Sequence, residues 1–376
     1  MKMNYVMLKD VCTINMGQSP DSNSYNDNGE GVPFFQGNAD FGERYPITRK
    51  WCSAPTKMAS PEDILISVRA PIGAMNYAKE DCCIGRGLAA ITPDKARVSS
   101  EFIFWLLKGK NAELNSKGTG STFKAIGRKI LEETLIPDIS LEKQSGYSNI
   151  LEKIYEIIQA RKLELQKLDD LIKARFVEMF GDPVGNPKGW TMVPLGTRCE
   201  IITGNTPSRA EAKNYGEFIE WIKSDNINTP YTFLTEAQEY LSEIGFQKCR
   251  FVEAGSLLMT CIAGSVNCIG NVAVADRRVA FNQQINAIVP NEDEVLYLYW
   301  LMLLSKPAIH RAINMALKGI LSKRQLSEMM FPFPPVALQK QFVTFVEQTD
   351  KSKVAVQKAL EQTQLLFDSL MQKYFG

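Results

Sequence analysis

The sequence predicts an α+β protein made of two similar domains, each followed by a long helix, with the two helices paired as an antiparallel coiled coil. Three observations lead there. An opening motif recurs about half a chain later, strand-like and helical segments follow the same order in both halves, and two long stretches show heptad spacing of apolar residues. A chain of 376 residues also exceeds what one hydrophobic core usually organises.

The opening motif, "LKDVCTINMGQSP" (8–20), recurs as "LGTRCEIITGNTP" (195–207), with Leu, Cys, Ile, Gly and Pro in register at a separation of 187 residues. Further matches follow in the same order, at separations between 187 and 197: 32–40 with 219–227, 63–70 with 256–263, 85–93 with 282–290, 104–107 with 299–302, and 136–144 with 333–341. Two diverged copies with short loop insertions explain this drift. The period is far longer than the 20–50 residues of a solenoid.

Each copy shows the same internal plan. Short β-rich runs come first, such as "DILISV" and "LAAIT" in the first copy and "SLLMT" and "NAIVP" in the second, separated by Gly, Asn and Pro turns. A helix is expected next, over 99–109 and 294–305. A polar segment rich in Gly, Ser and Lys follows, at 117–129 and 318–325, and a proline-containing link leads to a long helix.

The two long helices carry apolar seams at alternating steps of three and four, the spacing of a heptad repeat. The first seam contains Leu151, Ile154, Ile158, Arg161, Leu165, Leu168, Ile172, Arg175 and Met179. The second contains Val346, Thr349, Lys353, Val356, Leu360, Thr363, Phe367, Leu370 and Tyr374. Matching seams predict that the helices pair with each other, as a rod of roughly 50 Å. The alternative is that each helix packs only onto its own domain.

Composition favours an ordinary globular protein, with 45% hydrophobic residues, 23% charged residues and a formal net charge of +1. We expect no membrane span, because no apolar run reaches about 18 residues. The start of the chain lacks the apolar core of a secretory signal, so a cytoplasmic protein is expected. Eight cysteines without a CxxC pair predict buried reduced thiols rather than a zinc site.

A search for catalytic motifs predicts no catalytic, cofactor-binding or metal-binding residues in this chain. "GRGLAA" (85–90) satisfies GxGxxA, but Pro93 follows where a dinucleotide motif needs a helix. No phosphate-binding P-loop occurs, and His310 is the only histidine. We expect His310 to have a packing or capping role. An enzyme with an unrecognised methyltransferase or nuclease site remains a less favoured alternative.

Polar residues suited to nucleic acid cluster at matching places in both copies. Lys and Arg neutralise phosphates, hydroxyls fix register, and Arg, Asn or Gln can read base edges. The candidate DNA-binding residues are Ser19, Gln36, Asn38, Arg69, Arg86, Lys117, Ser121, Thr122, Lys124, Thr206, Lys223, Asn226, Gln283, Gln284, Lys318, Ser322, Lys323 and Arg324.

Several of these positions hold unlike residues in the two copies, as expected of domains that read different sequences. The pairs are Gln36 with Lys223, Asn38 with Asp225, Arg69 with Ile262, Arg86 with Gln283, and Gly87 with Gln284. Ordinary loop divergence is the alternative for any single pair.

The chain resembles the specificity (S) subunit of type I restriction-modification systems. The resemblance covers essentially the whole chain and rests on the "LxxxCxIxxGxxP" openings, the "DILIS" strand, the "GSTFKAI" segment and two long helices ending in Phe-Gly. It implies target-recognition domains at 1–140 and 182–337, with an antiparallel coiled-coil spacer formed by helices at 141–181 and 338–376.

The resemblance further implies double-stranded DNA, two methyltransferase (M) subunits and restriction (R) subunits as partners. S-adenosylmethionine, ATP and Mg are then expected on the partner subunits, and no cofactor in this chain. The expected target is bipartite and non-palindromic, with a gap of about five to eight base pairs. A type IIB-like or phage-exclusion system would use a similar chain, and an adaptor that binds no DNA is a third alternative.

Overall fold

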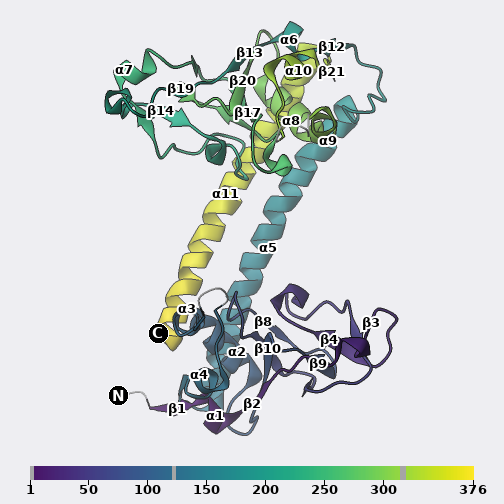
Figure 1. Cartoon of the computed structure of the whole chain (residues 1–376), viewed down its shortest axis with the longest axis vertical. Coiled ribbons are helices and arrows are strands. Elements are labelled where there is room, and N and C mark those ends of the chain that lie inside the picture. The colour runs from purple at the N-terminus through teal and green to yellow at the C-terminus, as the bar shows by residue number, and fades with distance from the viewer. Residues whose placement is uncertain (1–3, 121–123, 314–318) are drawn as a thin grey trace. The chain divides into compact units, whose positions relative to one another are not determined.

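The computed structural model describes residues 4–120, 124–313 and 319–376, and the chain divides into two compact units. Unit 1 comprises Met1–Leu163 together with Gln357–Gly376, and unit 2 comprises Glu164–Val356. Each unit therefore contains one globular domain and a part of both long helices (Figure 1).

The domain of unit 1 (domain 1) precedes helix α5, Leu141–Phe180. Its strands are β1 Tyr5–Met7, β2 Cys12–Met16, β3 Tyr25–Asn26, β4 Val32–Phe35, β5 Trp51–Cys52, β6 Met58–Ala59, β7 Ile64–Ser67, β8 Met75–Tyr77, β9 Cys82–Ile84, β10 Leu88–Pro93 and β11 Leu135–Pro137. Its helices are α1 Leu8–Val11, α2 Ser100–Gly109, α3 Asn111–Ser116 and α4 Arg128–Glu132.

The domain of unit 2 (domain 2) repeats this order and precedes helix α11, Val336–Phe375. Its strands are β12 Met192–Pro194, β13 Cys199–Thr203, β14 Tyr215–Ile222, β15 Tyr240–Leu241, β16 Phe251–Val252, β17 Ser256–Thr260, β18 Val272–Ala275, β19 Val279–Phe281, β20 Ile285–Pro290 and β21 Met330–Pro332. Its helices are α6 Leu195–Arg198, α7 Glu243–Phe246, α8 Val295–Leu304, α9 Lys306–Ala312 and α10 Lys323–Glu328.

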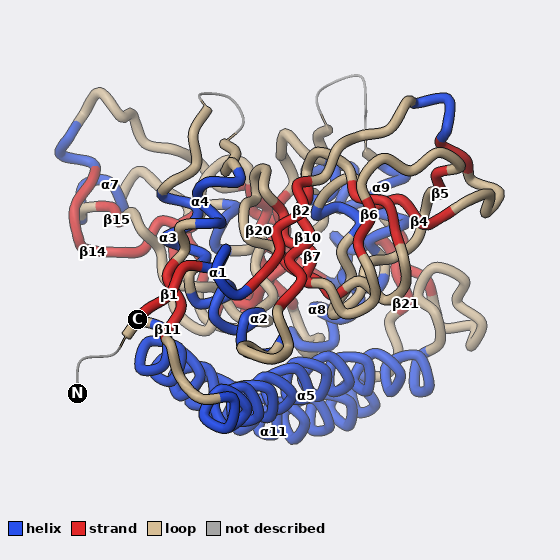
Figure 2. Tube along the Cα trace, turned by 90° about the horizontal axis from the view of Figure 1, so that it is seen from below, coloured by secondary structure: helices blue, strands red, loops and turns tan. Residues whose placement is uncertain are grey.

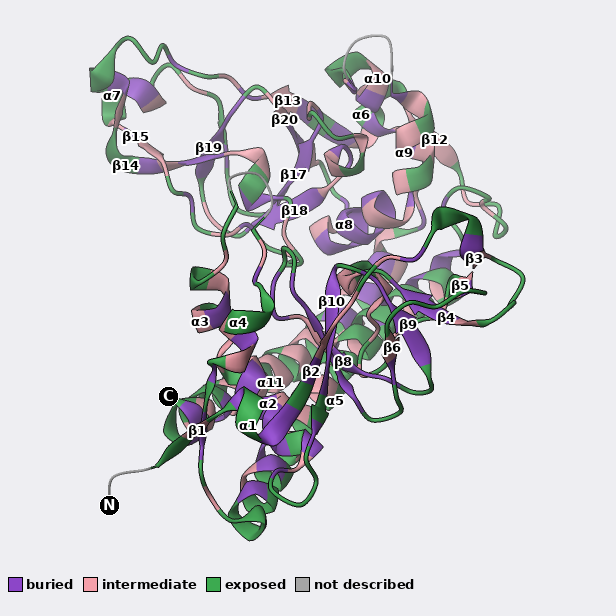
Figure 3. Cartoon of the chain, turned by 60° about the horizontal axis from the view of Figure 1, so that its bottom comes forward, coloured by how far each residue is buried: buried purple, intermediate pink, exposed green. Residues whose placement is uncertain are grey.

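Domain 1 is layered around a sheet of strand order β2-β10-β7-β8, and a second sheet has the order β3-β5-β4-β9-β6. The strand β7 is buried on both faces, and Figure 3 shows its neighbour β10 coloured largely as buried. Ile64 and Ile66 face a core shared with α2, while Leu65 packs with Ile84 on the other side. Two buried faces explain why these strands read as continuous apolar runs rather than as alternating patterns.

Domain 2 has a matching first sheet of order β13-β20-β17-β18, in the same register, and a second sheet of order β15-β14-β19-β16. In domain 1, Ile91 of β10 pairs with Ile14 and Ile64. The corresponding residue of β20, Ile288, pairs with Ile201 and Leu257. The predicted duplication, including its strands and the helices α2 and α8, is therefore confirmed.

The predicted match of 136–144 with 333–341 is wrong by two residues. Gln144 accepts a hydrogen bond from the backbone N–H of Ser99 and donates to the carbonyl of Ile139. Gln339, rather than Gln341, makes the equivalent bonds, to Glu294 and Pro334. The shared letters "KQ" placed the two segments in the wrong register. The buried side-chain amides of Gln144 and Gln339, which bond each long helix to the domain before it, show the correct register.

The two long helices pair in opposite directions, as predicted. In unit 1 the end of α11 packs on the start of α5, where Tyr147 stacks on Tyr374 with ring centroids 3.9 Å apart. In unit 2 the start of α11 packs on the end of α5 through Phe342 and Phe176. Figure 2 shows the two helices running side by side.

The seam residues lie toward the helix partner or the adjoining domain, and none of them is classed as exposed. Phe375 at the end of α11 also contacts Phe102 of α2, with ring centroids 5.6 Å apart. The alternative in which each helix packs only onto its own domain is therefore wrong, because α11 follows domain 2 in the chain and packs in unit 1. Among the described helices, none has an apolar stretch long enough to cross a bilayer.

Candidate nucleic-acid interface

In domain 1 the predicted residues gather around the turn between β9 and β10. The backbone N–H of Gln18 donates to the carbonyl of Ile84 (3.0 Å), and that of Gly17 donates to Leu88 (2.9 Å). A Cβ atom at Gly17 would lie 2.2 Å from the carbonyl oxygen of Gly85, so only glycine fits there. The first motif of the repeat therefore holds the segment that bears Ser19 against the turn that bears Arg86.

Two further loops join the same surface of domain 1. A Cβ atom at Gly87 would lie 2.3 Å from the carbonyl oxygen of Gln36, which places these two loops in direct contact. Arg69 pairs with Ala125 across a β-bridge, and the N–H of Ala70 donates to the carbonyl of Lys124 (3.0 Å). The side chains brought together, and called here the loop surface of domain 1, are Ser19, Gln36, Arg69, Arg86 and Lys124.

Ser19 and Arg86 touch directly. The Ser19 hydroxyl accepts a hydrogen bond from the backbone N–H of Arg86 (3.4 Å), and the side chain of Arg86 is exposed. Gln36, Arg69 and Lys124 are exposed as well. Polar and cationic side chains on a hydrogen-bonded loop framework can contact phosphates and base edges together.

Domain 2 builds the same framework from its own residues. Gly204 donates to Ile285 (3.0 Å), and a Cβ atom there would lie 2.2 Å from the carbonyl oxygen of Asn282. The hydroxyl of Thr206, the counterpart of Ser19, donates to the Oε1 atom of Gln283. The carbonyl of Gln284 accepts from Cys261 (2.8 Å), while its side-chain oxygen accepts from Asn282 (3.2 Å). The expected pairs Arg86/Gln283 and Gly87/Gln284 are thus equivalent in space.

The expected pair Asn38/Asp225 is wrong, because the turn after β14 is one residue shorter than the turn after β4. Asp40 closes the first turn by accepting from the N–H groups of Gln36 and Gly37. Asn226 closes the second by accepting from the N–H of Lys223 (3.0 Å). Residues 38–40 therefore correspond to 224–226, and Gln36 has no counterpart in domain 2.

Two domain 2 candidates are engaged within the protein. Asn226 is buried, with 6% of its surface exposed, and donates to the carbonyl of Glu236 (3.0 Å) in addition to closing its turn. Lys223 forms an ion pair with Glu239. The Lys223 ammonium, with Arg209 beside it, holds the pKa of the Glu239 carboxyl below its usual value. Neither side chain belongs to the loop surface of domain 2, which comprises Thr206, Gln283 and Gln284.

The remaining candidates flank these surfaces. Lys117 is exposed and pairs with Glu113 (2.6 Å). Ser322 caps α10 by accepting from the N–H of Gln325 (3.2 Å), next to the exposed Lys323. Arg324 pairs with Glu328 (2.8 Å), which raises the pKa of its guanidinium. Ser121, Thr122 and Lys318 lie outside the described residues.

Sequence reasoning missed one pair of basic residues, Lys57 and Arg250. The carbonyl of Lys57 accepts from Ile84 (2.8 Å) beside Gln18, and the N–H of Arg250 donates to the side chain of Asn205, the counterpart of Gln18. Both are exposed. Extending the match of 63–70 with 256–263 upstream at its separation of 193 would have revealed them.

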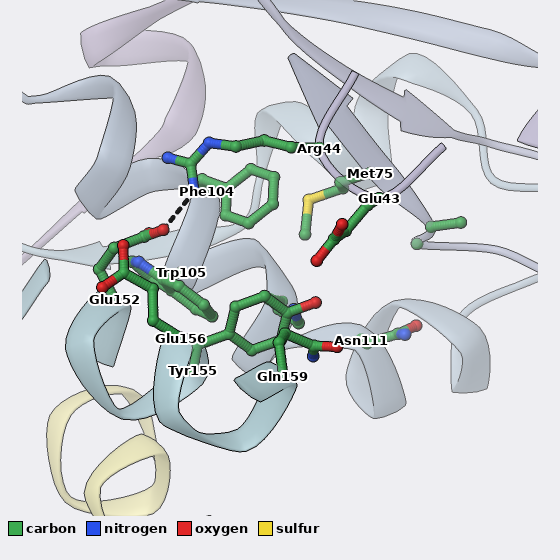
Figure 4. A pocket seen from close by; sticks show the side chains of 13 residues that line it. Glu43, Arg44, Met75, Phe104, Trp105, Asn111, Glu152, Tyr155, Glu156 and Gln159 are labelled. Atoms are coloured by element: carbon green, nitrogen blue, oxygen red, sulfur yellow. Dashed lines mark hydrogen bonds and ion pairs between the residues drawn. The ribbon is translucent and has the colours of Figure 1, made fainter. Parts of the chain in front are cut away.

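A pocket of about 580 Å³ lies where domain 1 meets α5 (Figure 4). Arg44 pairs there with Glu152 of α5, and the Lys108 ammonium lies 4.1 Å from the centroid of the Tyr155 ring. Burial lowers the pKa of Lys108. None of the candidate DNA-binding residues lines this pocket, and its contacts fasten α5 to domain 1.

Two other features have structural roles. The GxGxxA segment runs from a turn into β10 rather than into a helix, and the His310 ring nitrogen Nε2 hydrogen-bonds to the Ile269 carbonyl (2.9 Å). Within residues 4–120, 124–313 and 319–376, no group of three or more His, Cys, Asp or Glu side chains is placed to hold a metal ion.

Comparison with known proteins matches the repeat to one family. The profile described as "Type I restriction modification DNA specificity domain" matches residues 2–168 and 187–364. The chain is 44% identical over 154 residues to a protein named as the MjaX type I restriction enzyme specificity subunit of Methanocaldococcus jannaschii, covering 41% of this chain and 36% of the relative. It is 20% identical over 355 residues to the EcoBI specificity subunit of Escherichia coli, covering 84% and 73%.

A solved structure has the same fold along the whole chain. The S subunit of a type I restriction-modification system from M. genitalium superimposes with a TM-score of 0.60 at 15% identity, covering 100% of this chain and 96% of the other. The match covers less than half the length of two of the curated specificity subunits. The family profile nevertheless covers both domains. The chain belongs to the family of type I restriction modification DNA specificity domains and carries two copies of that domain.

Proposed function

We propose that this chain is the DNA-reading subunit of a type I restriction-modification system and directs its partners to a bipartite target. One observation carries the proposal: two copies of a single loop framework present different polar side chains at equivalent positions, such as Arg86 and Gln283. A shared framework gives each domain the same way of docking on DNA. Unlike side chains give each domain a different sequence to read.

The chain is proposed to be non-catalytic and to bind double-stranded DNA, two M subunits and R subunits in the cytoplasm. S-adenosylmethionine, ATP and Mg would then be bound by the partners. The helices α5 and α11 have 40 residues each, or roughly 60 Å at 1.5 Å per residue. A spacer of that size suits half-sites about one turn of DNA apart, with a gap of about five to eight base pairs.

The first experiment is to co-express the chain with its cognate methyltransferase subunits and map methylated adenines across the genome. We expect a gapped, two-part, non-palindromic motif that disappears when this chain is omitted. A continuous motif, or methylation that persists without the chain, would refute the proposal. Methylation or cleavage by the purified chain alone would favour an enzyme instead.

Lys124 and Lys323 distinguish DNA reading from a purely structural adaptor. Lys124 is exposed on the loop surface of domain 1, and Lys323 is exposed close to that of domain 2, since Leu321 bonds to Cys261, which bonds to Gln284. Lys124→Ala and Lys323→Ala should therefore each lower affinity for all sequences. Each should also reduce the slope of log K against log salt by about 1. Lys79→Ala is the matched control, because Lys79 is exposed after β8, at the opposite end of the strands from Arg69. An adaptor predicts that all three variants bind as the wild type does.

A further inference from the structure

We propose that the two half-sites differ in a defined way: domain 1 contacts a guanine through Arg86, and domain 2 contacts an adenine through Gln283. This inference rests on the proposed function and goes beyond it by naming a base for each domain.

Arg86 and Gln283 occupy the same place in the fold. Each is the second residue of a turn closed by one backbone hydrogen bond, from Leu88 to Gly85 (3.0 Å) and from Ile285 to Asn282 (3.2 Å). Each lies beside a hydroxyl near the end of the opening motif, that of Ser19 or Thr206. A base edge that reaches one side chain in domain 1 would therefore meet the other in domain 2.

The guanidinium of Arg86 is free to bind a base. The bond to the Ser19 hydroxyl uses the backbone N–H of Arg86 and leaves the side chain of Arg86 unengaged. In the part of the chain that the structure describes, the Arg86 guanidinium meets no hydrogen-bond acceptor and no carboxylate. Gly85 and Gly87 flank Arg86, so no neighbouring side chain shields it within the turn. A guanidinium with its donors unused matches the O6 and N7 acceptors of guanine in the major groove.

Gln283 is held in an orientation that suits adenine. Because the Thr206 hydroxyl donates to Oε1, it fixes which end of the amide carries the oxygen and which carries the NH2 group. Within the described ranges no other group bonds to this amide, so one lone pair of Oε1 and both hydrogens of Nε2 remain available. Adenine offers the complementary pair in the major groove, a donor at N6 and an acceptor at N7.

The neighbouring positions strengthen the contrast. Arg69 is exposed in domain 1, and its counterpart Ile262 is an apolar residue that bridges to Ile320. The one lysine at the end of β14, Lys223, is neutralised by Glu239. Domain 1 thus presents guanidinium groups where domain 2 presents an amide and an aliphatic side chain. This difference favours G·C in one half-site and A·T in the other.

The test exchanges the two side chains in the full chain, co-expressed with its cognate methyltransferase subunits. Arg86→Gln should lower methylation of sites that keep the guanine by at least about tenfold and change one position of one half-site only. Gln283→Arg should change one adenine of the other half-site. Asn291→Ala is the matched control, because Asn291 is exposed at the opposite end of β20. The unchanged half-site in each variant shows that the complex is intact.

A second measurement uses the wild-type complex and needs no variant. Each guanine of the domain 1 half-site, and each adenine of the domain 2 half-site, is replaced in turn by its 7-deaza form, which lacks the N7 acceptor. One substitution in each half-site should weaken binding about tenfold or more. Unchanged half-sites in both exchange variants, or full binding to every 7-deaza duplex, would overturn the base assignment. A bipartite wild-type motif would still uphold the proposed function.

Discussion

At the scale of single residues, two glycines explain why the repeated motif persists in both halves of the chain. Gly17 and Gly204 lie so close to the carbonyls of Gly85 and Asn282 that a methyl group at either would sit 2.2 Å from an oxygen. The backbone contact of each glycine holds a hydroxyl-bearing segment on its turn. Packing against the turn therefore requires glycine at this position of the motif in both domains.

Gly17→Ala and Gly204→Ala should each destabilise the chain by about 1–3 kcal/mol, because backbone must move to admit the methyl group. Thermal unfolding measures this cost. Gly264→Ala is the control, since no atom lies within 4 Å of the position of its Cβ and the residue is exposed, and it should shift stability by less than about 0.5 kcal/mol. Equal stability of all three variants would contradict the close approach seen here.

The buried cysteines are expected to be unreactive. Burial raises the pKa of Cys12 and of Cys199 to about 12, so both remain neutral thiols from pH 6 to pH 10 in the folded chain. Unfolding restores an ordinary pKa near 8.5, and hence reactivity above that pH. Mass spectrometry after alkylation at pH 8 should find Cys268, which is partly exposed, modified first. Early modification of Cys12 would contradict the burial.

At the scale of elements, the last turn of α11 stabilises the unit that contains the first domain. Phe375, 7% exposed, packs on Phe102, and Tyr374 stacks on Tyr147. Residues more than 200 positions apart thus form one core, which is why the long helices and the globular domains cannot be separated along the chain.

Phe375→Ala should lower the free energy of unfolding by about 3 kcal/mol, the usual cost of deleting a buried aromatic ring. Urea denaturation of the full chain provides the measurement. Lys373→Ala, on the exposed side of the same turn, should have little effect. If Phe375→Ala were as stable as the control, α11 would not contribute to the core of unit 1.

At the scale of the whole molecule, the two helices should set the distance between half-sites. A heptad inserted after Ile158 in α5 must be matched by one within Gln357–Gly376 of α11, because the helices pair in unit 1. Seven residues add about 10.5 Å, or about three base pairs at 3.4 Å each. Methylome mapping should show a longer gap and unaltered half-sites. Altered half-site letters would refute the spacer role.

The sequence by itself determined the duplication, the order of strands and helices, and the pairing of the long helices. Repeated apolar periodicity and shared turn residues are local signals, and a single chain displays them without any partner. It also located most of the loop surfaces, since Arg86, Arg69 and Lys124 stand in matched polar segments.

Only the tertiary structure decided which polar residues are available. Asn226 and Lys223 look like base readers in the sequence, yet one closes a buried turn and the other is paired with Glu239. Only the fold distinguishes the guanidinium of Arg86, which meets no hydrogen-bond or ion-pair partner among the described residues, from the amide of Gln283, which is held by Thr206. The physical reason is that hydrogen-bond partners lie tens of residues away along the chain, so local pattern identifies a candidate side chain, and long-range packing decides whether it is free to bind.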